Sequence, residues 1–216
     1  MQYKVGLLGR DGVGKTSIVL QLVDNYFSRS FKPTSGVFRI NYNITQDDTE
    51  ITLSINDFPG EIDFDSPMVE MVKSLDAILI VTNNNYTDTS LREELRILLQ
   101  RIQNLFAVKT PYIAIVGNHF VSDDGPSPRH SPCPSDLKEA SQRSSPLPPL
   151  EVDSGDLESQ SLAASMQIDY YSVCAYSGYG IRSLFDSVAR KLTTTRAPPE
   201  AAPVKSKWEC FRLCWH

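Results

Sequence analysis

A glycine-rich loop near the start of the chain constrains the fold more than any other segment. Residues 9–16 are Gly-Arg-Asp-Gly-Val-Gly-Lys-Thr, which fits the pattern G-x-x-x-x-G-K-[S/T]. An apolar strand pattern near residues 3–8 precedes the loop, and a helical pattern near residues 15–25 follows it. A strand, a glycine loop and a helix in that order bring a chain of phosphates to the N-terminus of the helix. The loop therefore predicts an α/β fold that binds nucleotide phosphates.

Each kind of residue in this loop has a chemical reason to be there. Glycines let the backbone turn with its N–H groups facing inward, where side chains would crowd a phosphate. The Lys15 ammonium is a point charge for the β- and γ-phosphates, and the Thr16 hydroxyl is a ligand for Mg²⁺. The alternative is a glycine-rich turn that binds nothing. The residues expected to contact the nucleotide here are Gly9, Asp11, Gly12, Val13, Gly14, Lys15, Thr16 and Ser17.

Strand and helix patterns alternate along the rest of the chain. Residues 37–56 alternate apolar and polar side chains around a polar turn, which predicts an antiparallel hairpin. Continuous apolar runs predict buried parallel strands, and helical spacing of leucines and isoleucines predicts helices. The strands are expected at 77–81, 112–116 and 168–174, and the helices at 91–105, 157–166 and 178–192. This order predicts a doubly wound, mostly parallel sheet of the P-loop NTPase type, with six strands, one antiparallel edge strand and about five helices.

The predicted domain covers residues 1–192 and is interrupted by a segment rich in Pro and Ser at about 122–153. Half of the 14 prolines of the chain lie in this segment. Because such a composition buries too little apolar surface to offset its ordering entropy, we expect a disordered insertion. It is either a plain linker or a regulated docking segment with Ser-Pro phosphorylation sites. Residues 193–216 are expected to form a flexible tail with basic and aromatic residues.

Composition excludes several classes of protein. The net charge of −5 gives no overall basic signature for nucleic-acid binding. No apolar run approaches the roughly 20 residues that a transmembrane helix needs, and no signal peptide is apparent. The four cysteines, Cys133, Cys174, Cys210 and Cys214, have neither metal-site spacing nor a disulfide pattern. These features predict a cytoplasmic α/β protein.

Two further segments, together with the glycine loop, resemble the small GTPases of the Ras superfamily. They are residues 27–34, which run from Phe27 to Thr34, and Asp57-Phe58-Pro59-Gly60-Glu61. The resemblance implies GTP or GDP with Mg²⁺ as cofactors, with Thr16, Thr34 and Asp57 at the metal. It also implies that the N–H of Gly60 meets the γ-phosphate and that Phe27 packs against the base. Lys15, Thr34 and Glu61 match the family's catalytic positions, and residues 27–40 and 57–73 match the surfaces that contact protein effectors and regulators.

Two departures from the family pattern predict slow hydrolysis. Asp11 stands where the family usually has a small residue, so a carboxylate lies near the γ-phosphate. Glu61 replaces the glutamine that positions the attacking water. An ionised glutamate accepts hydrogen bonds but cannot donate one.

The guanine-recognition motif is altered as well. The family has Asn-Lys-x-Asp, and this chain has Asn118-His119-Phe120-Val121. Val121 leaves the guanine N1 and N2 donors without the usual carboxylate, which weakens discrimination between bases. The later loop Cys174-Ala175-Tyr176 resembles the family's Ser-Ala-Lys. We expect Asn118, His119, Ala175 and Tyr176 to contact the base or sugar, with Cys174 buried.

The tail allows two alternatives. The last four residues do not match the prenylation pattern. Palmitoylation of Cys210 and Cys214, with the basic and aromatic residues around them, would anchor the chain to the cytoplasmic face of a membrane. The other alternative is a free tail.

Three functions remain open from sequence alone. The first is a signalling GTPase that binds GTP and hydrolyses it slowly. The second is a nucleotide-bound module that does not cycle and acts through its surface. The third is an ATP-using P-loop enzyme, which the altered guanine motif allows.

Overall fold

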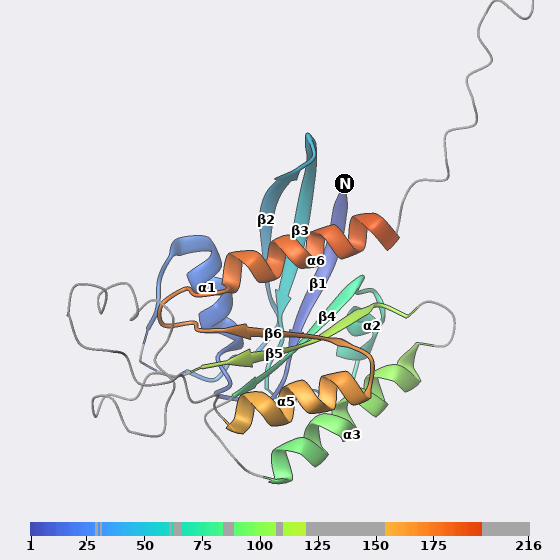
Figure 1. Cartoon of the computed structure of the whole chain (residues 1–216). Helices are drawn as coiled ribbons and strands as arrows, with labels where there is room; N and C mark the ends of the chain where they lie inside the picture. The colour runs from blue at the N-terminus through green and yellow to red at the C-terminus, as the bar shows by residue number, and fades with distance from the viewer. Residues whose placement is uncertain are drawn as a thin grey trace, which may run out of the picture.

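Six strands form one mixed sheet in the computed structural model of the chain (Figure 1). The structure describes residues 1–28, 30, 32–60, 62, 66–83, 89–106, 110–119 and 154–195. The strands are β1 (Gln2–Leu8), β2 (Phe38–Gln46), β3 (Thr49–Asp57), β4 (Ala77–Asn83), β5 (Tyr112–Asn118) and β6 (Asp169–Val173). They lie in the order β2-β3-β1-β4-β5-β6, and only the β2–β3 pair is antiparallel. The predicted sheet, with its antiparallel edge strand, is confirmed.

Helices cover both faces of the sheet. Among the described residues these are α1 (Lys15–Asp24), α2 (Met68–Lys73), α3 (Thr89–Leu105), α5 (Ser154–Ser165) and α6 (Ile181–Thr195). Buried side chains of α1 and α6 belong to one apolar cluster, and those of α2, α3 and α5 to a second cluster. Figure 1 shows α1 and α6 on one side of the strands and α3 and α5 on the other. The sheet therefore separates two cores, as a doubly wound fold requires.

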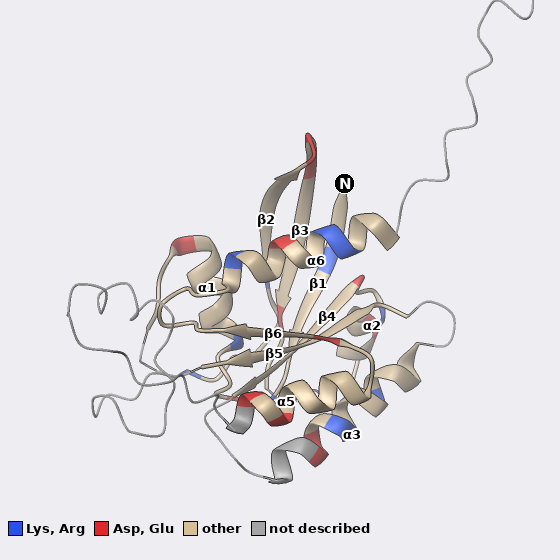
Figure 2. Cartoon of the chain, in the orientation of Figure 1, with Lys and Arg blue, Asp and Glu red and all other residues tan. Residues whose placement is uncertain are grey.

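The apolar residues of helix α6 form the buried face that their spacing in the sequence predicts. Its apolar side chains recur at helical spacing and are buried, and Figure 2 shows Lys, Arg and Asp along its length. The helix begins at Ile181, three residues later than predicted, because Gly178 and Gly180 have φ of 77° and 72°. Such left-handed residues end a loop but cannot continue a right-handed helix. The helix ends at Thr195, three residues past the predicted Leu192.

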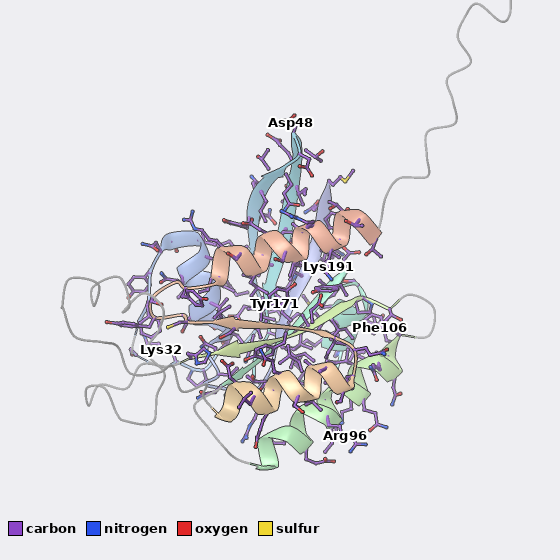
Figure 3. The ribbon with its side chains drawn as sticks, in the orientation of Figure 1. Lys32, Asp48, Arg96, Phe106, Tyr171 and Lys191 are labelled. Atoms are coloured by element: carbon purple, nitrogen blue, oxygen red, sulfur yellow. The ribbon has the colours of Figure 1, made fainter. Side chains whose placement is uncertain are left out.

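The β2–β3 hairpin turns at Asp47 and Asp48, whose φ values are 47° and 59°. Two successive left-handed residues form the tight turn that matches the twist of a hairpin. Figure 3 labels Asp48 at the tip of this hairpin. Strand β2 lies at one edge of the sheet and is largely exposed, whereas β3 is buried between β2 and β1.

The carboxyl ends of the parallel strands meet at one edge of the sheet, which positions the candidate site. Leu7 of β1 lies beside Asp57 of β3, and Asn118 of β5 lies beside Val173 of β6. The glycine loop, Thr34, Gly60, His119 and Ala175 lie in described loops at this edge. Open α/β sheets bind their ligands at such an edge. In the part of the chain that the structure describes, no helix combines the length and apolar character that crossing a membrane would require.

Candidate nucleotide-binding site

The glycine loop joins β1 to α1 in the conformation that its sequence predicts. Gly9 and Gly14 have φ of 139° and 93°, values that residues with a Cβ rarely adopt. A Cβ at Gly9 would also collide with the backbone oxygen of Val81 in the neighbouring strand. Gly14 is the N-cap of α1, and its carbonyl accepts the first helical hydrogen bond from Ile18 at 2.9 Å. The first N–H groups of α1 are therefore placed to bind an anion.

Lys15 lies inside the loop rather than in solvent. Its side chain is buried, and Nζ donates to the backbone oxygens of Gly9 and Arg10, both at 2.8 Å. Burial lowers the pKa of Lys15, although the carboxylates of Asp57 and Asp11 oppose that shift. The ammonium is thus held by backbone carbonyls at the place where the sequence predicts a phosphate contact.

Thr16, Thr34 and Asp57 come together from three separate segments. The Thr16 hydroxyl donates to Asp57 Oδ2 at 2.6 Å, and its oxygen lies 3.0 Å from the hydroxyl oxygen of Thr34. Asp57 is 1% exposed, and its Oδ1 has no hydrogen-bond partner among the described residues. Burial raises the pKa of Asp57, opposed by the Thr16 hydrogen bond and the charge of Lys15.

This trio fits Mg²⁺, which prefers hard oxygen ligands and is usually held by one or two carboxylates together with substrate phosphates. A buried carboxylate oxygen without a partner is costly, and a cation or its bound water would remove that cost. Across the described ranges, no three His, Cys, Asp or Glu side chains gather into a metal-binding group. The candidate metal site therefore has one carboxylate and two hydroxyls, and it leaves the remaining positions to phosphate and water.

Gly60 and Asp11 face each other across the phosphate side of the site. A Cβ placed on Gly60 would collide with the carboxyl group and the backbone nitrogen of Asp11. The backbone of residue 60 therefore approaches the glycine loop as closely as its lack of a side chain permits. Asp11 lies against the residue whose N–H, by resemblance, would meet the γ-phosphate. Glu61 lies outside the described residues.

Asn118 fastens the other end of the site. Its side chain is fully buried, donates from Nδ2 to the Val13 oxygen and accepts at Oδ1 from the Ala175 N–H, both at 3.0 Å. One amide thus joins the glycine loop to the loop after β6. The Ala175 N–H, expected at the base, is already used by this bond. Cys174 is fully buried beside it, as predicted.

Aromatic side chains form the outer wall near Ala175. The rings of Phe27 and Tyr176 meet edge to face, with centroids 5.4 Å apart and planes at 85°. His119 turns toward α5 and β6, where its Nε2 lies 2.7 Å from Ser172 Oγ and 3.3 Å from Asp156 Oδ2. The sequence pattern predicts that His119 lies near a base, but it contains no signal for the partners Ser172 and Asp156.

A cavity of about 650 Å³ joins the two ends of the site. Its volume suits a small-molecule ligand of nucleotide size. Of the residues expected at a nucleotide, the cavity is lined by Asp11, Gly12, Gly14, Lys15, Thr16, Ser17, Phe27, Thr34, Asn118, His119, Ala175 and Tyr176. Gly9, Val13, Asp57 and Gly60 are not among its lining residues. Leu20, Tyr26, Ser28, Ser30 and Lys32 also line it, and only their closeness in sequence to Phe27 or α1 could have predicted that.

Comparison with known proteins agrees with this geometry. The model of the Ras family matches residues 4–194. The chain belongs to the Ras family. Among curated relatives of this Ras-family chain, the Ypt/Rab-type GTPase ypt71 of Schizosaccharomyces pombe is 36% identical over 56% of the chain and 58% of its own length. The Ras-related protein RABG3b of Arabidopsis thaliana is 37% identical over 38% of the chain and 41% of its own length. The chain thus aligns with about two fifths to three fifths of these relatives.

Proposed function

We propose that this Ras-family chain is a small GTP-binding switch that uses Mg²⁺. The observation that carries the proposal is the meeting of Thr16, Thr34 and Asp57 beside the buried ammonium of Lys15. Thr34 lies in the segment that precedes β2, and Asp57 is the last residue of β3, where the segment that follows the hairpin begins. A ligand that holds both segments would order them, and its loss would release them. This is the physical basis of a two-state switch.

The chain's own groups divide the work along the cavity. The N–H groups at the start of α1 and the Lys15 ammonium would bind the phosphates. Thr16, Thr34 and Asp57 would hold Mg²⁺, which when bound neutralises phosphate charge. The walls around Phe27, Asn118 and Tyr176 would enclose the base and sugar. An aromatic ring there could stack its face on a base, and stacking tolerates more than one base.

Slow hydrolysis is part of the proposal. The Asp11 carboxyl lies against Gly60, so its negative charge would stand close to the γ-phosphate. Like charge there repels both the phosphate and the water that must approach it. At position 61 a glutamate replaces the glutamine of the family and cannot donate a hydrogen bond to a phosphate oxygen. Both features also support the second candidate, a nucleotide-bound module that does not cycle.

Partner contacts are proposed at the segments that would change with the nucleotide. Residues 27–40 and 57–73 include exposed groups on the hairpin and helix α2, among them Phe38, whose side chain is 52% exposed on the edge strand β2. Protein effectors and regulators are expected there. A membrane contact through Cys210 and Cys214 remains a proposal from sequence, because the tail beyond Thr195 lies outside the described residues.

Nucleotide titration tests the binding proposal. The protein is stripped of nucleotide and titrated with fluorescent GTP, GDP and ATP in the presence of Mg²⁺. We expect guanine nucleotides to bind more tightly than ATP and Lys15→Met to abolish binding, while the exposed Lys73→Met binds as wild type. Equal binding of ATP and GTP would favour the ATP-using P-loop enzyme. Absence of binding to all three would refute a nucleotide switch.

Single-turnover hydrolysis separates the cycling switch from the module that does not cycle. GTP is loaded, and phosphate release is followed for wild type, Asp11→Gly, Glu61→Gln and the double variant. If charge and lost donors slow the reaction, the double variant should hydrolyse at least about tenfold faster than wild type. Detectable wild-type hydrolysis supports the cycling switch. No hydrolysis by any variant, with binding intact, supports the module.

A further inference from the structure

A polar cluster lies behind the base end of the cavity and joins three elements. His119 follows β5, Tyr170 and Ser172 belong to β6, and Asp156 lies in the first turn of α5. The His119 Nε2 lies 2.7 Å from Ser172 Oγ and 3.3 Å from Asp156 Oδ2. On the far side of the carboxylate, the Tyr170 hydroxyl donates to Asp156 Oδ1. Both carboxylate oxygens of Asp156 are therefore engaged.

The cluster is not a nucleophilic triad. A triad needs the serine and the carboxylate on opposite nitrogens of the imidazole, and here both face Nε2. Its geometry suits support of the ring instead. The side chains of His119 and Asp156 are 21% and 19% exposed, so water screens their interaction only partly. Burial raises the pKa of Asp156, but the hydrogen bonds from His119 and Tyr170 outweigh it and lower that pKa.

His119 also lines the cavity, beside Asn118 and Tyr176. Its backbone is fixed, since the His119 N–H donates to the Val173 oxygen at 2.8 Å and continues the β5–β6 ladder. What remains to be fixed is the direction of the ring. Ser172 and Asp156 fix the direction of the His119 ring. The orientation of the ring in the cavity wall is therefore set before a ligand binds.

We propose that Asp156 and Ser172 are positioning residues that hold His119 as a preformed wall at the base end of the cavity, and that they thereby set how long a nucleotide stays bound. This rests on the proposed function. A ring already held in place loses little rotamer freedom when a base or sugar packs against it. An imidazole without such support would have to be ordered when the nucleotide binds, and this loss of entropy would lower the affinity for nucleotide. Lysine occupies this position in the family pattern, whereas in this chain a supported imidazole lies there.

The arrangement also links helix α5 to the nucleotide. Asp156 brings α5 into the cluster, and it reaches a ring that lines the cavity. A displacement of α5 would remove that support and speed nucleotide release. By reciprocity of binding free energies, a bound nucleotide would hold α5 in place to the same extent.

Release of fluorescent GDP from the full chain tests the proposal. The release rate is measured by stopped flow for wild type, Asp156→Asn, Ser172→Ala and His119→Ala. We expect Asp156→Asn and His119→Ala each to speed release about tenfold, the effect of losing one hydrogen bond to a charged group. Ser172→Ala is the milder variant, expected to speed release by about threefold, and it applies even where Asp156→Asn does not fold.

Asp169→Asn is the matched control. Asp169 also accepts from a tyrosine, Tyr112 at 2.6 Å, and it pairs with Lys191 at 2.9 Å. It begins β6, at the end of the strand away from the cavity. Figure 3 labels Tyr171 and Lys191, its neighbours on β6 and α6. This variant loses a similar carboxylate without touching the base end, so it should release GDP within about twofold of wild type.

Double-mutant and NMR measurements distinguish positioning from general stabilisation. If Asp156 acts through His119, a variant with both Asp156→Asn and His119→Ala releases GDP no faster than His119→Ala alone. The reason is that the two substitutions remove the same interaction. The imidazole Hε1 signal of GDP-bound His119, assigned by its loss in His119→Ala, should shift in Asp156→Asn and Ser172→Ala but not in Asp169→Asn. Additive rates, an unmoved signal or unchanged release would overturn the inference. If wild type itself binds no nucleotide, the proposed function fails with it, and the titration alone reveals that.

Discussion

Burial of the Asp57 carboxylate costs stability, and metal binding should remove that cost. We therefore expect the order of stability of wild type and Asp57→Asn to reverse when Mg²⁺ and nucleotide are added. The Oδ1 of Asp57 has no partner among the described residues, and burial is the main reason its pKa is raised. A raised pKa means that folded protein binds this proton more tightly than unfolded protein does. The resulting stabilisation is complete below the ordinary value of about 3.9 and is lost as pH rises through the raised pKa. At pH 7, without metal, the ionised side chain therefore destabilises the fold.

Asp57→Asn removes the charge and keeps an oxygen that can accept the Thr16 hydrogen bond. A buried polar group left unpaired costs about 1–3 kcal/mol, and the nearby Lys15 ammonium offsets part of that cost. We expect the substitution to raise the free energy of unfolding by about 1–2 kcal/mol at pH 7. That corresponds to about 2–8 °C in the melting temperature of a chain of this size.

The assay is thermal unfolding of nucleotide-free protein in EDTA, followed from pH 7 toward pH 4. The stability difference between Asp57→Asn and wild type should shrink as pH falls, because wild-type Asp57 becomes protonated. Asp186→Asn, which removes an exposed carboxylate outside the site, is the control. With Mg²⁺ and GDP at about 100 times their Kd, wild type should gain about 2.7 kcal/mol and overtake the variant. An Asp57→Asn protein that is less stable than wild type in EDTA at pH 7 would refute the reasoning.

Three further predictions concern the surroundings of the site. Asn118→Ala should lower the free energy of unfolding in urea by about 2–4 kcal/mol, because it strands the Val13 oxygen and the Ala175 N–H; a loss under 1 kcal/mol would contradict the described bonds. Gly60→Ala should cost about 1–3 kcal/mol by forcing the backbone away from Asp11, and an unchanged melting temperature would show that the loops have room. Lys191→Met should change stability by less than about 1 kcal/mol at low salt and by less still in 1 M NaCl, since its ion pair is exposed.

Local pattern was enough to predict most of the fold. Apolar runs such as residues 77–81 and 112–116 are typical of buried strands, and each forms a strand that pairs with a neighbour on both sides. Helix α2, at Met68–Lys73, was not located, because six residues with two buried valines show no helical period. The start of α6 was set by Gly180, a backbone effect that the periodicity of its side chains does not carry.

The candidate site was predictable where a motif carries its own geometry. The glycine loop dictates where Lys15 and Thr16 lie, because the backbone conformation and the helix start are local. The partners of His119 were not predictable, since Asp156 and Ser172 are distant in sequence and no local pattern relates them. The same holds for Ala175, whose N–H is taken by Asn118 only because two strands bring them side by side.

The two ends of the cavity differ in what fixes them, and this determines how each can change. The phosphate end is built from backbone N–H groups, glycine conformations and one buried lysine, so most substitutions there break it. The base end is built from side chains held by other side chains, such as Asn118 by two backbone groups and His119 by Asp156 and Ser172. A side chain in such a wall can be replaced during evolution if other side chains hold its replacement in place. This difference between the two ends predicts that the glycine loop is kept while side chains at the base end change. The chain fits that prediction, because it keeps the loop and has a supported histidine in place of the family's lysine.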